Sequence, residues 1–268
     1  NIALDYLFLY PLDMGIFGAA LATGTAPVIG LCLTSLHSLT RRNQYRLARP
    51  AYPARSLADV AGLGSAAFLN EFTSCMVLAL YNLLMLRAAG TVGVAAYGVV
   101  ANLALMALAL FTGLSQGAQP LISQAYGRGD TPAVRQLCRL ALLVSCLVGL
   151  ALALTAQLAA QPLVALFNRD GDPALAKIAV EGLRIYFWGF LCAGPNIITA
   201  AFLGAAEQPR ASFLLSLFRG GVGIAVLVLL LAWLLGITGI WLAFPVTELL
   251  TLFLGLGVSR KVLRAPLP

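Results

Sequence analysis

Residues 138–158 read CRLALLVSCLVGLALALTAQL, a stretch in which Arg139 is the only charged side chain. A helix of about 20 residues crosses about 30 Å of hydrocarbon, because each residue adds about 1.5 Å. A similar length and apolar character recur at residues 14–36, 60–86, 93–123, 183–206, 211–235 and 237–257. The sequence therefore predicts an all-α polytopic membrane protein with seven spans.

The composition argues against a soluble domain. Hydrophobic residues make up 60% of the chain and charged residues 10%, whereas an average soluble domain is roughly half apolar and a quarter charged. The longest polar segments, residues 37–59 and 168–182, are too short to fold alone. The sequence shows no phosphate-binding loop, dinucleotide fingerprint or nucleophile motif, so it predicts that the protein is not an enzyme.

The first ten residues, NIALDYLFLY, are apolar but too short to cross a bilayer. Because the chain opens on Asn rather than Met, we expect it to begin inside an eighth helix whose start lies upstream. On this interpretation the chain is a fragment of a longer protein.

The formal net charge of +7 is unevenly distributed along the chain. If residues 37–59 are cytoplasmic, successive crossings place residues 124–137, 207–210 and 258–268 on the same side, and these segments hold most of the 17 basic residues. This positive-inside pattern predicts a multi-pass protein of the plasma membrane, here a bacterial inner membrane, with a cytoplasmic C-terminus. It also explains the charge without a nucleic-acid partner.

A short repeat links the two ends of the chain. Residues 14–23, MGIFGAALAT, and residues 235–244, LGITGIWLAF, share an apolar-G-I-x-G-apolar-x-L-A pattern. Both helices run from outside to inside in the topology above, so the repeat is parallel, an arrangement found among secondary transporters. Alternatively, so short a match arises because glycine-containing turns are common before apolar helices.

Two longer stretches point to a family. Residues 71–102, EFTSCMVLALYNLLMLRAAGTVGVAAYGVVAN, and residues 113–130, GLSQGAQPLISQAYGRGD, resemble the second half of the multidrug and toxic compound extrusion (MATE) family. Residues 1–23, NIALDYLFLYPLDMGIFGAALAT, look like the family's fifth helix and the start of its sixth. The resemblance covers essentially the whole chain.

The resemblance implies a domain organisation, since family members have twelve helices in two six-helix lobes. Residues 1–36 would be the remnant of a truncated N-terminal lobe, its fifth and sixth helices, and residues 37–59 a cytoplasmic interlobe loop. Residues 60–258 would form the six-helix C-terminal lobe and residues 259–268 a cytoplasmic tail.

The resemblance also implies a function, that of a secondary active multidrug exporter. Inward movement of Na⁺ or H⁺ would drive outward movement of small cationic amphipathic compounds, by alternating access between the two lobes. No cofactor beyond this coupling ion is expected, and the partners would be membrane lipid and the missing N-terminal helices. The alternatives are a lipid-linked oligosaccharide flippase of a related exporter family and a non-transporting membrane fragment.

Acids inside the spans are candidates for ion coupling, because a charge at the bilayer centre costs about 2.5–3.5 kcal/mol on insertion scales. Asn1 and Asp5 are four residues apart and share one helix face, where their oxygens suit a hard cation. In MATE members an N-x-x-x-D pair on the fifth helix and a threonine on the sixth form a cation site. The resemblance places this site, with Na⁺ as its expected metal ion, at Asn1, Asp5 and Thr23. A cap or a pairing with a neighbouring helix is the alternative.

Glu71 lies well inside the span 60–86. Asn82 follows eleven residues later, about three helical turns, so the two share one polar stripe that should line a cavity. Glu71 could there exchange a proton or attract a cationic compound, and several MATE members carry an acid at the matching place. Members with a second-lobe sodium site have an aspartate where this chain offers only Asn196 and Thr199. A structural hydrogen bond remains the alternative for Glu71.

The next span carries three amides: Asn102 and Gln116 fall on one helix face, and Gln119 follows a turn later at a bend that Pro120 favours. Amides at a bend can contact substrate, although hydrogen bonds between helices are their commoner use in membranes. Glu248 in the last span and Arg219 in the preceding one can pair, but their apparent depths differ. We expect a structural role for both.

Overall fold

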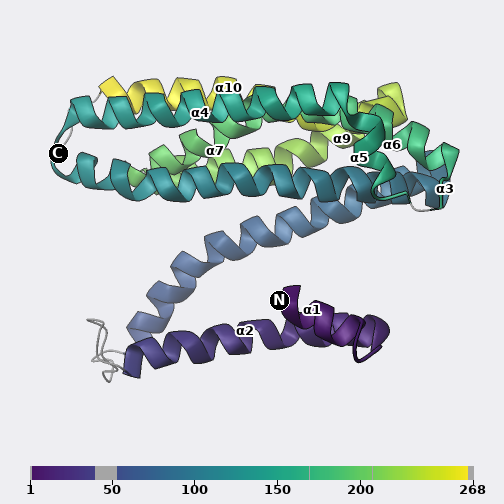
Figure 1. The fold of residues 1–268 in the computed structure, drawn as a ribbon. Coiled ribbons are helices and arrows are strands. Elements are labelled where there is room, and N and C mark those ends of the chain that lie inside the picture. The colour runs from purple at the N-terminus through teal and green to yellow at the C-terminus, as the bar shows by residue number, and fades with distance from the viewer. Residues whose placement is uncertain (1, 40–52, 169, 207, 265–268) are drawn as a thin grey trace. The chain divides into compact units, whose positions relative to one another are not determined.

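The computed structural model describes residues 2–39, 53–168, 170–206 and 208–264, and every element in these ranges is a helix (Figure 1). The chain divides into two compact units, Asn1–Asp59 and Val60–Pro268. The assignment of these units to two lobes of a transporter stays a prediction.

The first unit is a pair of helices, α1 (Ile2–Leu9) and α2 (Gly15–Leu39). The turn between them uses two left-handed residues, Asp13 at φ 46° and Gly15 at φ 56°, a conformation that glycine and aspartate tolerate best. Gly18 lets α2 approach α1, because a Cβ there would lie 3.0 Å from the Phe8 carbonyl oxygen. The pair therefore forms a tight hairpin.

The long element α3 (Pro53–Gly127) begins in the last residues of the first unit and continues through the start of the second. It turns back on itself at Gly90, where φ is 67° and ψ is −155°. In a straight helix Tyr81 and Tyr97, sixteen residues apart, would be separated by about 24 Å. Their ring centroids instead lie 5.2 Å apart with the rings nearly parallel. Thus α3 is a hairpin whose arms match the predicted spans 60–86 and 93–123 (Figure 1).

Short side-chain caps fix where the next helices begin. Asp130 accepts a hydrogen bond from the Ala133 backbone N–H at 3.0 Å and starts α4, and Asp172 accepts one from Ala174 at 2.8 Å and starts α6. The remaining elements follow in chain order: α4 (Thr131–Leu158), α5 (Ala160–Ala165), α6 (Pro173–Tyr186), η1 (Phe187–Gly189), α7 (Phe190–Ala205), α8 (Pro209–Leu217), η2 (Phe218–Val222), α9 (Gly223–Leu235) and α10 (Ile237–Arg264).

The described residues contain six helical stretches long and apolar enough to cross a membrane, with the α3 hairpin counted once: Gly15–Leu36, Glu71–Gly127, Thr131–Leu158, Pro173–Ala205, Pro209–Leu235 and Ile237–Ser259. They correspond to the seven predicted spans, so the all-α membrane fold class is confirmed. Two boundaries were predicted too late. The spans expected at residues 138–158 and 183–206 begin at Thr131 and Pro173, because a capped polar turn precedes each apolar run.

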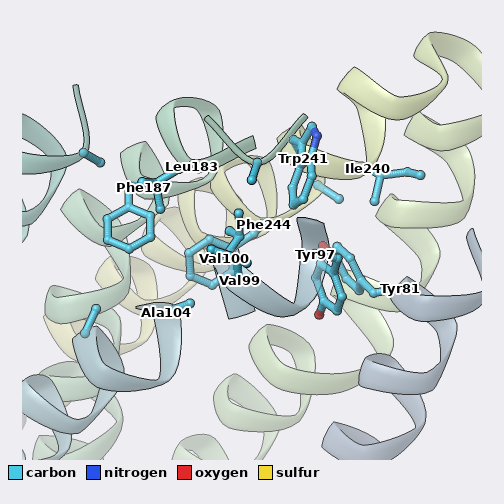
Figure 2. Close-up of a cluster of buried hydrophobic side chains, with 14 of the residues drawn as sticks. Tyr81, Tyr97, Val99, Val100, Ala104, Leu183, Phe187, Ile240, Trp241 and Phe244 are labelled. Atoms are coloured by element: carbon cyan, nitrogen blue, oxygen red, sulfur yellow. The ribbon is translucent and has the colours of Figure 1, made fainter. Parts of the chain in front are cut away.

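Small and aromatic residues interlock in the core of the second unit. Tyr81 and Tyr97 stack beside Trp241, whose ring centroid lies 6.2 Å from that of Tyr97 (Figure 2). A Cβ on Gly182 would lie 2.5 Å from the Trp241 ring, and one on Gly189 would lie 2.5 Å from the Phe244 ring. Close approach at small residues is the usual basis of helix packing in lipid. This core holds α6, α7 and α10 together around the residues described next.

Candidate functional site

A buried ionic network joins three helical elements in the second unit. Glu248 on α10 is 1% exposed, and its Oε1 lies 3.1 Å from Nη1 of Arg219 on η2. Asn196 on α7 donates from Nδ2 to Glu248 Oε2 at 2.7 Å, and the same nitrogen lies 2.7 Å from the Glu248 backbone oxygen. The carboxylate is thus held on one oxygen by a cation and on the other by an amide.

The two charged side chains of this network differ in their exposure to solvent. The Arg219 side chain is 24% exposed whereas that of Glu248 is 1% exposed, so Arg219 is partly accessible and Glu248 is not. An isolated carboxylate in such a place would carry a large desolvation cost, which Arg219 offsets. Of the two paired side chains, that of Arg219 is thus the more accessible.

One oxygen beside the ion pair lacks a hydrogen-bond donor. Oδ1 of Asn196 is buried and has no hydrogen-bond partner within the described part of the chain. Thr247 and Thr251 are also buried, and their hydroxyls donate to the backbone oxygens of Ala243 and Thr247 at 2.6 and 2.7 Å. Leaving a buried acceptor unsatisfied costs about 1–3 kcal/mol. The Asn196 oxygen is thus an unused acceptor close to the carboxylate.

Arg219 belongs to a π-helical turn, η2, with the sequence FRGGV. Such turns are rare and occur frequently at functional sites. A Cβ on Gly221 would lie 2.5 Å from Thr73 Cγ2, and one on Gly220 would lie 3.8 Å from Ser74 Oγ. The turn therefore packs against the first arm of α3, one helical turn from Glu71.

The residues predicted for ion coupling belong to both units. Asn1 is outside the described residues, while Asp5 is half-buried on α1. Thr23 is exposed on α2, and its hydroxyl donates to the Ala19 carbonyl oxygen at 3.0 Å. Glu71 is exposed on the first arm of α3, and the structure gives its carboxylate no ion pair with any described residue. Their roles stay predictions.

The predicted substrate-contacting amides are mostly directed to their own helices. Asn82 donates from Nδ2 to the Leu78 oxygen at 3.0 Å, and Asn102 donates to the Gly98 oxygen at 2.8 Å. Gln116 is exposed. Gln119 is also exposed, and its Nε2 would lie 3.7 Å from a Cβ on Gly204 of α7. The structure does not draw these amides into one cluster, and their contact with substrate stays a prediction.

The sequence offered Glu248 and Arg219 as a possible pair, but it did not connect Asn196 with them. Its expectation that the two charges lie at different depths is wrong, because they meet at 3.1 Å. Counted from Pro209, where α8 begins, Arg219 lies about 15 Å along its helix, and Glu248 lies about 17 Å from Ser259. Counting residues from the same membrane face would have matched their depths. The π-helical turn has no comparable signature in the sequence.

Comparison with known proteins places this fold among transporters. A family model described as MatE matches residues 66–234. The chain is 27% identical over 261 residues to the multidrug export protein MepA of Staphylococcus haemolyticus, covering 96% of this chain and 56% of the relative. It is also 27% identical over 264 residues to the FAD transporter of Shewanella oneidensis, covering 93% of this chain and 56% of that protein. The chain thus spans just over half the length of these curated relatives.

Solved structures show the same fold. The outward-facing conformation of a multidrug resistance MATE family transporter of the MOP superfamily matches with a TM-score of 0.85 at 20% identity, over 98% of this chain and 59% of that one. The inward-facing conformation of such a transporter matches with a TM-score of 0.77 at 19% identity, over 98% of this chain and 61% of that one. Because the family model matches more than half of its residues, the chain belongs to the MatE family.

Proposed function

We propose that the protein is a secondary active multidrug exporter of the plasma membrane, in which Na⁺ or H⁺ moves inward as small cationic amphipathic compounds move outward. The likeness to a multidrug export protein and to an FAD transporter supports export of organic compounds. Alternating access would proceed between this helical unit and a second lobe, with the C-terminus in the cytoplasm.

The observation that carries this proposal is the buried carboxylate of Glu248 in a membrane-spanning helix, paired with a partly exposed Arg219. A coupling ion can shift an inward–outward equilibrium only if it binds the two states with different affinity. A carboxylate held in a low-dielectric core provides such a difference, because its interactions depend strongly on whether a cation is present.

In this proposal, the site residues predicted from the sequence have the following roles. Asn1, Asp5 and Thr23 would form the first-lobe cation site. Glu71 would meet the cationic substrate, or carry a proton, at a cavity that the amides of Asn82, Asn102, Gln116 and Gln119 help to line. Exposure of Glu71 on α3 supports such a role, since an acid on an apolar helix is costly where only lipid faces it.

Transport measurements in reconstituted vesicles test the proposal. The full-length protein is given an inward Na⁺ gradient or an inward H⁺ gradient, applied separately, and export of a fluorescent cationic dye is followed. We expect one gradient to drive the dye against its concentration. FAD is measured in parallel, because one relative is an FAD transporter. Dye flux equal to that of empty vesicles under both gradients would contradict the proposal, and flux of FAD alone would contradict the cationic substrate class.

A further inference from the structure

The ion pair between Glu248 and Arg219 has the residues that a cation-exchange site requires, an acid and a cation that it binds. Glu248 is satisfied by one positive charge, which Arg219 supplies at 3.1 Å. Any small cation that offers the same charge can take the place of the guanidinium. The unused Oδ1 of Asn196, buried beside the carboxylate, is a further oxygen that could accept a proton donor or coordinate a hard cation.

The elements around the ion pair carry few other charged groups, and one of them is Glu71 on α3, one helical turn from the residues that η2 contacts. Tyr186 on α6 and Cys192 on α7 are close enough to feel its charge, and both are neutral near pH 7 at their ordinary values. Among the neighbouring elements, α9 and η1 carry no charged residue and α8 carries only Arg210. The charged residues of α6, namely Lys177, Glu181 and Arg184, line a separate surface pocket.

The π-helical turn provides a way for Arg219 to leave. A π turn contains one residue more than the α-helical repeat, and its conversion to α-helix rotates the side chains within it. Here the residues that follow Arg219 are Gly220 and Gly221, whose backbone is less restricted than that of other residues, and Phe218 and Val222 complete the turn. The Arg219 side chain is 24% exposed, whereas the carboxylate side chain that it pairs with is 1% exposed.

We propose that Glu248 is a cation-exchange site in the second unit, in which Arg219 is the resident cation and a small monovalent cation, Na⁺ or H⁺, displaces it. Asn196 keeps its hydrogen bond to the carboxylate in both states and positions it. No covalent bond changes, except that in the H⁺ case the carboxylate gains the proton as the guanidinium withdraws. The inference deepens the proposed ion-coupled export by naming a coupling site, but its test does not depend on transport.

Infrared difference spectroscopy on the full-length protein provides that test. Isotope-labelled glutamate and arginine are used, and the bands of Glu248 and Arg219 are assigned by their loss in Glu248→Gln and Arg219→Gln. Exposed Glu181 on α6 gives the matched control, Glu181→Gln, which should retain every Glu248 band. Adding Na⁺ at fixed pH, or lowering the pH without Na⁺, should shift the Glu248 and Arg219 bands together. A response to Na⁺ alone identifies sodium, and a response to pH alone identifies the proton.

The affinity for the cation should depend on Arg219. Removing the resident cation in Arg219→Gln should lower the cation concentration for half-maximal change at Glu248 about tenfold. Since a single variant leaves one buried charge unpaired, the double variant Arg219→Gln with Glu248→Gln supplies a neutral reference protein. Glu248 and Arg219 bands that ignore both Na⁺ and pH would overturn the inference.

The two proposals fail in different ways. If Glu248→Gln exports dye with unchanged dependence on the ion gradient, Glu248 is not the coupling site and coupled export stands. If the Glu248 band responds to a cation in a protein that shows no ion-driven export, the exchange site stands and the proposed function is wrong.

Discussion

Glu248 and Arg219 neutralise each other inside the bundle, so the loss of either leaves a charge that the core cannot accommodate. Arg219→Gln should lower the free energy of unfolding by about 3 kcal/mol, the scale for removing one partner of a buried pair. The double variant Arg219→Gln with Glu248→Gln should recover most of this loss. Unfolding titrations in mixed micelles measure both. Arg210→Gln, at an exposed arginine on α8, is the control and should change little.

Neutralising Asp5 and neutralising Glu71 should impair different steps of export. Asp5→Asn should abolish ion-driven export with the fold retained, because the amide keeps the volume and removes the charge that distinguishes an ion-bound state. Glu71→Gln should instead weaken binding of the cationic dye. Vesicle export and dye-binding titrations on the full-length protein separate the two effects.

Two conservative variants control that experiment. Asp13→Asn changes an exposed acid in the turn between α1 and α2, where asparagine tolerates the same left-handed backbone, and Glu181→Gln changes an exposed acid on α6. Both should export normally. Wild-type export by Asp5→Asn would remove the coupling role from α1 and leave the acids of the second unit to carry it.

At the scale of elements, the α3 hairpin depends on the backbone of Gly90. A Cβ at Gly90 would meet nothing within 4 Å, so the obstacle to substitution is its φ of +67° with ψ of −155°. That region is essentially restricted to glycine. Gly90→Ala should therefore cost about 1–3 kcal/mol of stability.

A neighbouring glycine isolates the backbone effect. Gly98, in the second arm of α3, also has open space around its Cβ position but carries no positive φ. Gly98→Ala should be neutral or stabilising by up to about 1 kcal/mol, since alanine is the better helix former. Equal unfolding curves for the Gly90 and Gly98 variants would show that the reversal at Gly90 does not require glycine.

The π-helical turn makes a second comparison within one element. Gly221→Ala would place a Cβ 2.5 Å from Thr73 Cγ2 and should cost about 1–3 kcal/mol, because η2 must move off α3. Gly220→Ala would meet Ser74 Oγ at 3.8 Å, an ordinary contact, and should cost much less. Thermal unfolding in detergent ranks the two variants, and a larger loss for Gly220→Ala would mean that the packing of η2 has been misread.

The sequence predicted the membrane spans well, but it did not predict the buried network of Glu248, Arg219 and Asn196. Apolar length located every span, since lipid demands it, but helix starts at Thr131 and Pro173 depended on aspartate caps that hydropathy does not detect. Predicting the ion pair between Glu248 and Arg219 would have required knowing that the two residues lie at the same depth in the membrane and that Arg219 lies in a π-helical turn. Side chains 29 positions apart along the chain meet only through tertiary packing. Local periodicity contains no information about that contact.

For the molecule as a whole, the charge distribution predicts its orientation in the membrane. Cysteines at Arg128 and Ser259, in a background without exposed cysteines, should react with an impermeant reagent only from the cytoplasmic side. A cysteine at Asp170 should react only from outside, because α4 crosses the bilayer between Arg128 and Asp170. Labelling of positions 128 and 170 from the same face would contradict this topology.

Trp241 gives the molecule a built-in optical probe. It is 1% exposed within the aromatic core, whereas Trp188 is 47% and Trp233 is 81% exposed on the outside of the helices. We expect brominated lipids to quench those of the exposed indoles that face acyl chains in a bilayer, while the emission of the buried Trp241 is shielded. The protected signal comes from the centre of the unit alone, where Tyr97 lies beside Trp241 (Figure 2). Repacking of this core can thus be followed without attaching a dye.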